Sequence, residues 1–240
     1  MNDYPPVTIV MTTYFPEGSD GRHRRDVASH ALYSWEDNLG YKGQLRIHIA
    51  DDGSYCDFKT DWEYVTYTRQ ERMGVGSSLN KGIQQAFEVS DFVLHAVDDW
   101  LLVKEFDLTP WVRVLLERED IGLVRLGPPH PHIIGQAECL IEGIYDWGLI
   151  LKRKYYAFAT RPFLLHKRFI DAYGWFEEGK SAVEVERLYN ERFCSMSGPD
   201  IVYALPHFWE HVQSISMSEI EPDNSPCLYS DSENYVVYSK

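Results

Sequence analysis

Pairs of adjacent aspartates follow two hydrophobic segments of this 240-residue sequence. Asp51 and Asp52 follow "LRIHIA", and Asp98 and Asp99 lie within "FVLHAVDDWLLV". Two carboxylates are costly to bury unless a cation meets them. A carboxylate pair can hold a divalent cation through its oxygens, with phosphates completing the coordination shell. The chemistry that these residues suggest is therefore the binding of a metal ion that bridges to a diphosphate.

The hydrophobic pattern predicts the elements that must position these side chains. Strands are predicted over 7–14, 45–54, 63–68 and 92–103, and 200–212 is predicted as a strand that leads into a His-rich corner. Helices are predicted over 27–39, 74–87, 108–120 (Thr109 as N-cap) and 181–193. Strands that alternate with helices predict a largely parallel sheet, whose ligands bind at the carboxyl ends of the strands. Tyr14 and both aspartate pairs would meet at that edge.

A nucleoside fits the same edge of the predicted sheet. The ring of Tyr14 can stack on a base, and a carboxylate can accept a hydrogen bond from a base N–H or a ribose hydroxyl. The alternative is that each aspartate only caps a turn, and it is strongest for Asp52, which Gly53 follows. That alternative is weaker for all the strand ends taken together.

The composition limits the class of protein. The net charge of −14 opposes nonspecific binding to nucleic acid or anionic membrane unless basic residues cluster. No apolar run approaches the roughly 18 residues of a membrane-spanning helix, and "MNDYPPVTIV" does not resemble a signal peptide. The four cysteines have neither metal-site nor redox-motif spacing, which predicts reduced thiols and a cytoplasmic location.

Several segments together resemble family 2 glycosyltransferases with the GT-A fold. They are "VTIVMTTY", "IADDGS", "RMGVGSSLNKGI" and "DFVLHAVDDW", in the order typical of that family. The resemblance implies a single-domain α/β fold, GT-A-like, with a Rossmann-like nucleotide-binding half and a mixed, mainly parallel sheet. It predicts a domain over 1–218, with the nucleotide-sugar-binding half in 1–104 and the acceptor side in 105–218, followed by a polar tail over 219–240.

The resemblance also implies which residues hold the donor. They are Thr12, Thr13, Tyr14, Asp51, Asp52, Arg72, Gly74, Asn80 and Asp98. The sequence departs from the family pattern at three positions: Arg72 replaces an asparagine, Leu79 replaces an arginine, and Val97 replaces the first acid of the metal motif.

The resemblance also implies which residues bind the metal ion and which residue acts as the catalytic base. Asp99 is the predicted ligand of Mg²⁺ or Mn²⁺, and His211 in "FWEHVQSIS" is a further metal ligand. Glu184 takes the place of the family's catalytic base, and Glu177, Glu178 and Glu186 are alternatives. A structural interpretation of Glu184 stays open, because Ser181 and Glu184 have the spacing of a helix capping box.

The resemblance implies transfer of a sugar from a nucleoside diphosphate sugar, such as a UDP-sugar, to a hydroxyl acceptor, with inversion as the expected outcome. The segment 147–170 contains basic but no acidic residues, so the acceptor could be anionic, as a nucleic acid or a phosphorylated lipid is. "GRHRR" at 21–25 is interpreted as a basic loop that could add to this patch or neutralise the donor diphosphate. The alternatives are a DNA glycosyltransferase acting on a hydroxylated base, a nucleotide-sugar-binding module without turnover and, more weakly, a nucleotidyltransferase.

Overall fold

The computed structural model describes residues 4–58, 60, 62–127, 139–145, 148–153, 158–205 and 208–212, so the predicted tail over 219–240 lies outside the described residues. The helices are α1 (Ser19–Asn38), α2 (Val75–Phe87), α3 (Thr109–Glu117), α5 (Lys167–Tyr173) and α6 (Ala182–Ser195). The strands are β1 (Val7–Thr13), β2 (Leu39–Gly40), β3 (Leu45–Asp51), β4 (Val65–Arg69), β5 (Phe92–Val97), β6 (Trp100–Leu102), β7 (Phe106–Asp107), β8 (Ile121–Arg125), β9 (Cys139–Tyr145), β10 (Gly148–Arg153), β11 (Phe163–His166), β12 (Asp200–Leu205) and β13 (Trp209–His211).

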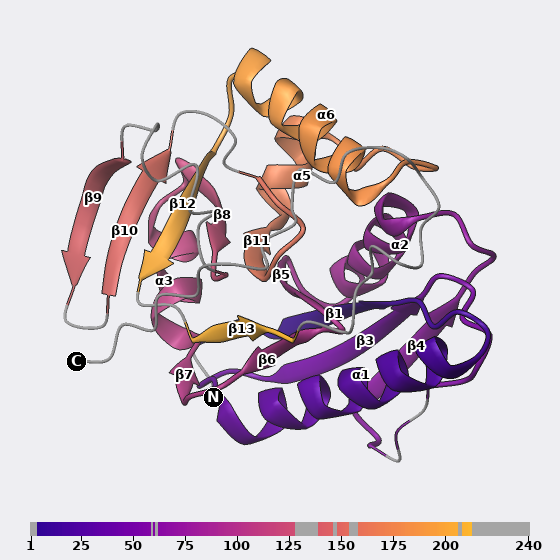
Figure 1. The fold of residues 1–240 in the computed structure, drawn as a ribbon. Helices are drawn as coiled ribbons and strands as arrows, with labels where there is room; N and C mark the ends of the chain where they lie inside the picture. Colours follow the sequence, from indigo (N-terminus) through magenta and orange to yellow (C-terminus); the bar gives the residue numbers. More distant parts are fainter. Residues whose placement is uncertain are drawn as a thin grey trace.

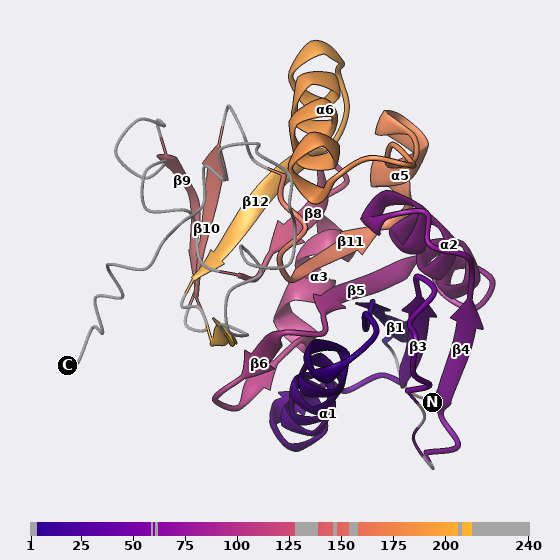
Figure 2. The same cartoon turned by 45° about the vertical axis from the view of Figure 1, so that its right-hand side comes forward.

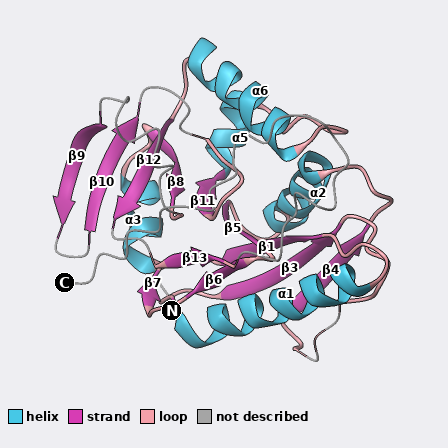
Figure 3. Ribbon diagram, viewed as in Figure 1, coloured by secondary structure: helices cyan, strands magenta, loops and turns pink. Residues whose placement is uncertain are grey.

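One continuous sheet runs through both halves of the described chain, in the order β4-β3-β1-β5-β11-β8-β12-β10-β9 (Figures 1 and 3). Strands β4, β3, β1 and β5 are mutually parallel, and β11 runs antiparallel between β5 and β8. Strand β12 is again parallel to β8, and the hairpin β9–β10 extends the sheet beyond it. The predicted α/β fold with a mixed, mainly parallel sheet is confirmed.

Helices cover the sheet on both faces, and each face has its own core (Figure 2). On one face, α1 and α3 share a core with alternate residues of β1 and β5; it includes Trp35, Trp111, Ile9 and Leu94. The other face is covered by α2, α5 and α6, and Gly82 of α2 lies so close to Val10 of β1 that an added Cβ would meet its side chain. Parallel strands need both faces covered, so the packing explains the near-continuous hydrophobic runs of β1 and β5.

One sequence-based boundary is wrong. The segment 92–103, predicted as one strand, divides in two, because β5 and β6 are separated at Asp98-Asp99. In the segment 200–212, the strand β12 is followed by a second short strand, β13, at the predicted corner. Strands β6 and β13 leave the main sheet and form an antiparallel pair. The indole Nε1 of Trp35 donates to the carbonyl of Trp100 at 2.8 Å, which anchors β6 to α1. Asp98 and Asp99 therefore lie in a turn and not within a strand.

The start of α3 also differs from the prediction. Its N-cap is Leu108, and Thr109 is the first helical residue. The Thr109 hydroxyl accepts a hydrogen bond from the backbone of Lys42 at 3.1 Å, and Asp107 accepts from the Thr109 N–H. The threonine side chain is thus used in a tertiary contact that local sequence does not show. Among the described residues, no helix has the length and apolar character needed to cross a membrane.

Candidate functional site

The parallel register of β1, β3 and β5 brings the predicted site residues to one edge of the sheet. Thr13 pairs with Asp51, and Thr12 pairs with Val97. The residues that directly follow these strands, among them Tyr14 and Asp98, therefore meet there. The glycine-initiated start of α2 lies at the same edge, because α2 follows the parallel strand β4.

Protein donors surround the carboxylates of Asp51 and Asp52. Asp51 accepts from the backbone N–H groups of Gly53 and Ser54, at 3.1 and 2.9 Å, and from the Thr13 hydroxyl at 3.1 Å. Asp52 is 6% exposed and accepts from the backbone N–H of Met73 and of Gly74 at 2.9 and 2.8 Å, and from the Gln70 amide at 2.8 Å. Both therefore fix turns, as the structural alternative predicted. Their contact with a nucleoside stays a prediction.

Tyr14 and Arg72 form a pair above this edge. The Arg72 guanidinium carbon lies 4.0 Å from the centroid of the Tyr14 ring, and Arg72 Nη1 donates to the Tyr14 hydroxyl at 2.9 Å. Met73 beside them is 46% exposed. A partly exposed aromatic ring next to a guanidinium offers stacking and positive charge to a nucleotide.

Gly74 and Asn80, which are also predicted to hold the donor, contact the loop that precedes α6. Gly74 is the N-cap of α2 with a φ of 86°, and an added Cβ would lie 3.0 Å from the Lys180 carbonyl oxygen. Asn80 is 3% exposed, and its side chain accepts from the Phe176 N–H and donates to the Phe176 carbonyl, both at 2.9 Å. It also donates to Glu178 at 3.0 Å. Asn80 thus holds the 176–178 segment in place, and its contact with the donor stays a prediction.

A guanidinium meets Asp98. This carboxylate is 2% exposed, and Arg24 Nη2 of α1 lies 3.3 and 3.4 Å from its two oxygens. Burial raises the pKa of Asp98 above its ordinary value, while the positive charge of Arg24 acts in the opposite direction. Sequence reasoning placed "GRHRR" in a loop, but α1 begins at Ser19 and includes it. The position of Arg24 in the sequence does not by itself show that it pairs with Asp98.

Asp99 faces His211 across a sequence separation of 112 residues. Strand β13 pairs with β6 so that His211 lies opposite Trp100, and His211 Nε2 is 3.0 Å from Asp99 Oδ2. The backbone N–H of Val212 donates to the Asp99 carbonyl at 2.8 Å, which fixes this register. The two residues predicted to hold a metal are therefore brought together.

Asp99 and His211 fit a divalent cation for which the substrate supplies the remaining ligands. Asp99 Oδ1 is buried without a hydrogen-bond partner, although such atoms are nearly always satisfied. One carboxylate, one imidazole and added phosphate oxygens form a suitable set, because a cation such as Mg²⁺ often uses one or two carboxylates plus phosphates. Within the described residues, no cluster of three His, Cys, Asp or Glu side chains could hold a metal without such help.

The capping box predicted for Glu184 is present. Ser181 Oγ accepts from the Glu184 N–H, and the Glu184 carboxylate accepts from the Ser181 N–H at 3.2 Å and from its hydroxyl at 3.0 Å. These bonds lower the pKa of Glu184, which keeps it ionised. The box lies at the start of α6, next to the start of α2: the Gly179 N–H donates to the Met73 carbonyl at 3.1 Å. The catalytic role stays a prediction.

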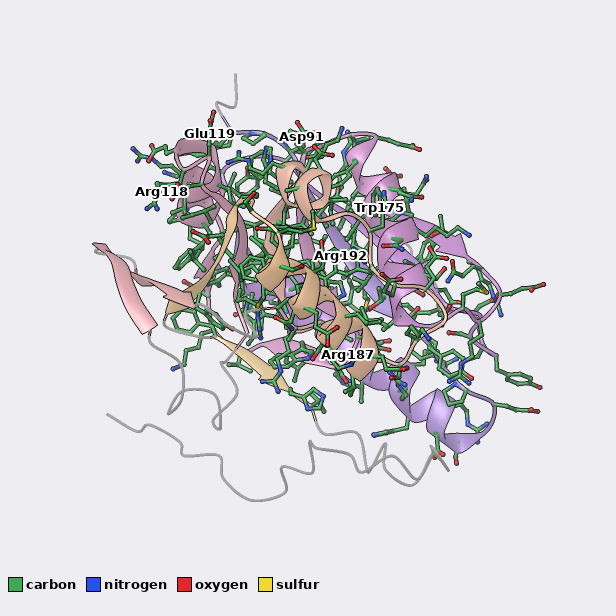
Figure 4. All side chains as sticks on the ribbon, turned by 90° about the horizontal axis from the view of Figure 1, so that it is seen from above. Asp91, Arg118, Glu119, Trp175, Arg187 and Arg192 are labelled. Atoms are coloured by element: carbon green, nitrogen blue, oxygen red, sulfur yellow. The ribbon has the colours of Figure 1, made fainter. Side chains whose placement is uncertain are left out.

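The alternative glutamates are held by other partners. Glu186 accepts from the N–H and hydroxyl of Thr160 at 2.8 and 2.7 Å, and Glu178 is bonded to Asn80. Glu177 forms an ion pair with Arg192, whose guanidinium also donates to the Trp175 carbonyl at 2.7 Å. Figure 4 labels Arg192 and Trp175 on these adjacent segments.

The basic segment is only partly available for an anionic acceptor. Arg168 donates to the carbonyls of Leu115 and Arg118 at the end of α3, at 2.9 and 3.0 Å. The Arg161 guanidinium lies 5.9 Å from the Trp100 ring, close to the Asp99–His211 pair. Parts of the segment, including Lys154, Tyr155 and Tyr156, lie outside the described residues.

Several solved structures have a fold similar to that of this chain. The chain superposes on S. aureus TarS 1-349 in complex with UDP-GlcNAc with a TM-score of 0.54 and 14% identity, over 88% of this chain and 61% of that one. It superposes on GalNAc-T7 with UDP, GalNAc and Mn²⁺ with a TM-score of 0.58 and 12% identity, over 85% and 43%. The fold is GT-A-like, that of glycosyltransferases. The chain spans less than two thirds of the length of either protein. No family model matches the sequence, and no curated protein matches it.

Proposed function

We propose that this chain transfers a sugar from a nucleoside diphosphate sugar to a hydroxyl acceptor. The observation that carries the proposal is the contact of Asp99 with His211, 3.0 Å apart, at the carboxyl edge of a GT-A-like sheet, with Asp99 Oδ1 buried and unpartnered. A divalent cation bound there would neutralise the negative charge that develops on the leaving diphosphate. The TarS and GalNAc-T7 structures, which contain UDP-GlcNAc and UDP with Mn²⁺ respectively, support this choice of ligands.

The chain's own residues would hold the donor in two parts. Tyr14 offers its ring to the base, and Arg72 beside it offers positive charge. Thr12, Thr13 and the backbone at the start of α2 line the same edge. In this proposal Asp51 and Asp52 act mainly through the turns that they fix, because their oxygens already accept from protein donors.

Glu184 would act as the general base. In an in-line displacement with inversion, its carboxylate takes the proton of the acceptor hydroxyl while the oxygen of that hydroxyl attacks the sugar carbon. The carboxylate is exposed and ionised, and Ser181 positions it at the start of α6. The capping and catalytic roles are compatible, since the base needs only to be ionised and close to the acceptor.

A donor screen tests the proposal. UDP-, GDP- and dTDP-sugars are incubated with the protein, with and without Mn²⁺, and release of nucleoside diphosphate is measured. We expect metal-stimulated hydrolysis of one donor class, lost in the Asp99→Asn variant. Binding of a nucleotide-sugar without any release, on water or on added acceptors, would instead support a binding module without turnover. Absence of both binding and release would refute the proposal.

A further inference from the structure

Arg24 engages one of the two carboxylates that follow β5. Its Nη2 atom lies 3.3 and 3.4 Å from the Asp98 oxygens, and the Arg24 and Asp98 side chains are only 15% and 2% exposed. The backbone of Tyr14 adds a hydrogen bond to the same carboxylate. A buried ion pair of this kind is costly to break, because removing one partner leaves an uncompensated charge. The fold therefore supplies the countercharge of Asp98 from α1.

Asp99, the next residue, has no such partner in the described part of the chain. One of its oxygens faces His211 and the other is buried without a hydrogen bond. Val97 on the other side of Asp98 contributes no carboxylate. With Asp98 neutralised, the local charge available to a cation is that of a single carboxylate.

We propose that Arg24 withholds Asp98 from metal coordination, so that Asp99 and His211 are the protein's ligands and a divalent cation is bound tightly only together with a nucleotide diphosphate. This inference rests on the proposed function. A hard cation held by one carboxylate and one imidazole remains largely hydrated, whereas diphosphate oxygens add both ligands and charge. Arg24 is then a positioning residue that makes metal binding conditional on the nucleotide.

The test titrates the full chain with Mn²⁺ and follows free Mn²⁺ by electron paramagnetic resonance. In the wild type, saturating nucleotide (UDP, GDP or dTDP, whichever binds) should raise the affinity for Mn²⁺ by on the order of 100-fold, because the diphosphate completes the site. Arg24→Gln should raise the affinity for Mn²⁺ alone by about tenfold, because it releases Asp98 beside Asp99. The double variant Arg24→Gln/Asp98→Asn should lose that gain. Arg25→Gln is the matched control, because Arg25 is a neighbour on α1 that is 40% exposed and pairs with Asp26, and it should change nothing.

Two results would overturn the inference: a wild type that binds Mn²⁺ equally tightly without nucleotide, or an Arg24→Gln protein with unchanged affinity for Mn²⁺ alone. If Arg24→Gln does not fold, the Asp98→Asn variant takes its place. Loss of a metal ligand lowers metal affinity by about 10-fold or more. A loss of that size in Asp98→Asn would overturn the inference, and an unchanged affinity for Mn²⁺ would support it. A protein that binds none of the nucleotides, with or without Mn²⁺, refutes the proposed function instead, and nucleotide binding reports that result separately.

Discussion

The two aspartate pairs look alike in sequence but differ in what surrounds them. At the end of β3, Asp51 accepts from the backbone of Gly53 and Ser54 directly after it, and Asp52 accepts from the backbone of Met73 and Gly74, 21 and 22 residues further along the chain. At the end of β5, Asp98 meets Arg24 from α1, and Asp99 meets His211 from β13. One oxygen of Asp99 has no partner. Every hydrogen bond named here for the first pair comes from β1, from its own turn or from the segment before α2, whereas the second pair meets one side chain from α1 and one from β13.

The difference shows how a fold separates structural carboxylates from those available to a ligand. A carboxylate that accepts several N–H bonds is held in place, and its charge is already balanced. A buried oxygen without a donor is rare and indicates a missing partner such as an ion. Two other ionisable groups show the same contrast: the Glu184 carboxylate accepts from Ser181, whereas Nδ1 of His95 is buried without a hydrogen-bond partner.

The largest expected effect is on the chemical step. Glu184→Gln should lower the transfer rate by about 10²- to 10⁴-fold, because glutamine cannot take the acceptor proton. The melting temperature and donor affinity should hardly change, since glutamine can still serve the capping box. Glu191→Gln on the exposed side of the same helix is the control. A variant rate within about threefold of wild type would exclude Glu184 as the base and direct attention to Glu186.

Replacing the unsatisfied carboxylate should affect binding. Asp99→Asn should weaken Mn²⁺-dependent nucleotide affinity by about 10- to 100-fold, because an amide is a poorer ligand for a hard cation. The fold should persist, since Asp99 lies in a turn at the edge of the sheet. Isothermal titration calorimetry of UDP with and without Mn²⁺ measures this. An unchanged metal-dependent affinity would contradict the role of Asp99.

Replacing the satisfied carboxylate should affect stability. Asp52→Asn should lower the free energy of unfolding by about 1–3 kcal/mol, because an amide NH₂ would oppose one of the N–H donors of Met73 or Gly74. Urea denaturation measures the change, and Glu71→Gln on the exposed side of the same loop is the control. A stable Asp52→Asn protein that cannot bind nucleotide would reverse the comparison and make Asp52 a nucleoside ligand.

The smallest expected effect is on how stability depends on pH, through the buried His95. Burial lowers the pKa of His95 from its ordinary value of 6.5 to about 3. Between these values the unfolded chain binds a proton that the native state does not, so stability falls as the pH drops below 6.5, at up to about 1.4 kcal/mol per unit. His95→Gln should flatten this slope between pH 6.5 and 5, whereas the exposed His30→Gln should not. Identical slopes for wild type and His95→Gln would contradict the assignment.

The sequence by itself determined the order of the elements from β1 to β5 and the edge of the sheet at which the candidate site residues meet. Hydrophobic periodicity and the glycines before α2 are local signals, and parallel strands bring their carboxyl ends together whatever else surrounds them. The same local logic predicted the Ser181–Glu184 capping box correctly, because its partners are three residues apart.

Only the tertiary structure decided where β5 ends and what each carboxylate contacts. Strand β6 separates from β5 because it pairs with β13 and is anchored by Trp35, and neither contact is visible in a hydrophobic run. The partners of Asp98 and Asp99 lie 74 and 112 residues away in sequence. The net charge of a buried group depends on which distant cation the fold brings to it. Two identical Asp–Asp pairs could therefore acquire different surroundings, and local pattern alone could not distinguish them.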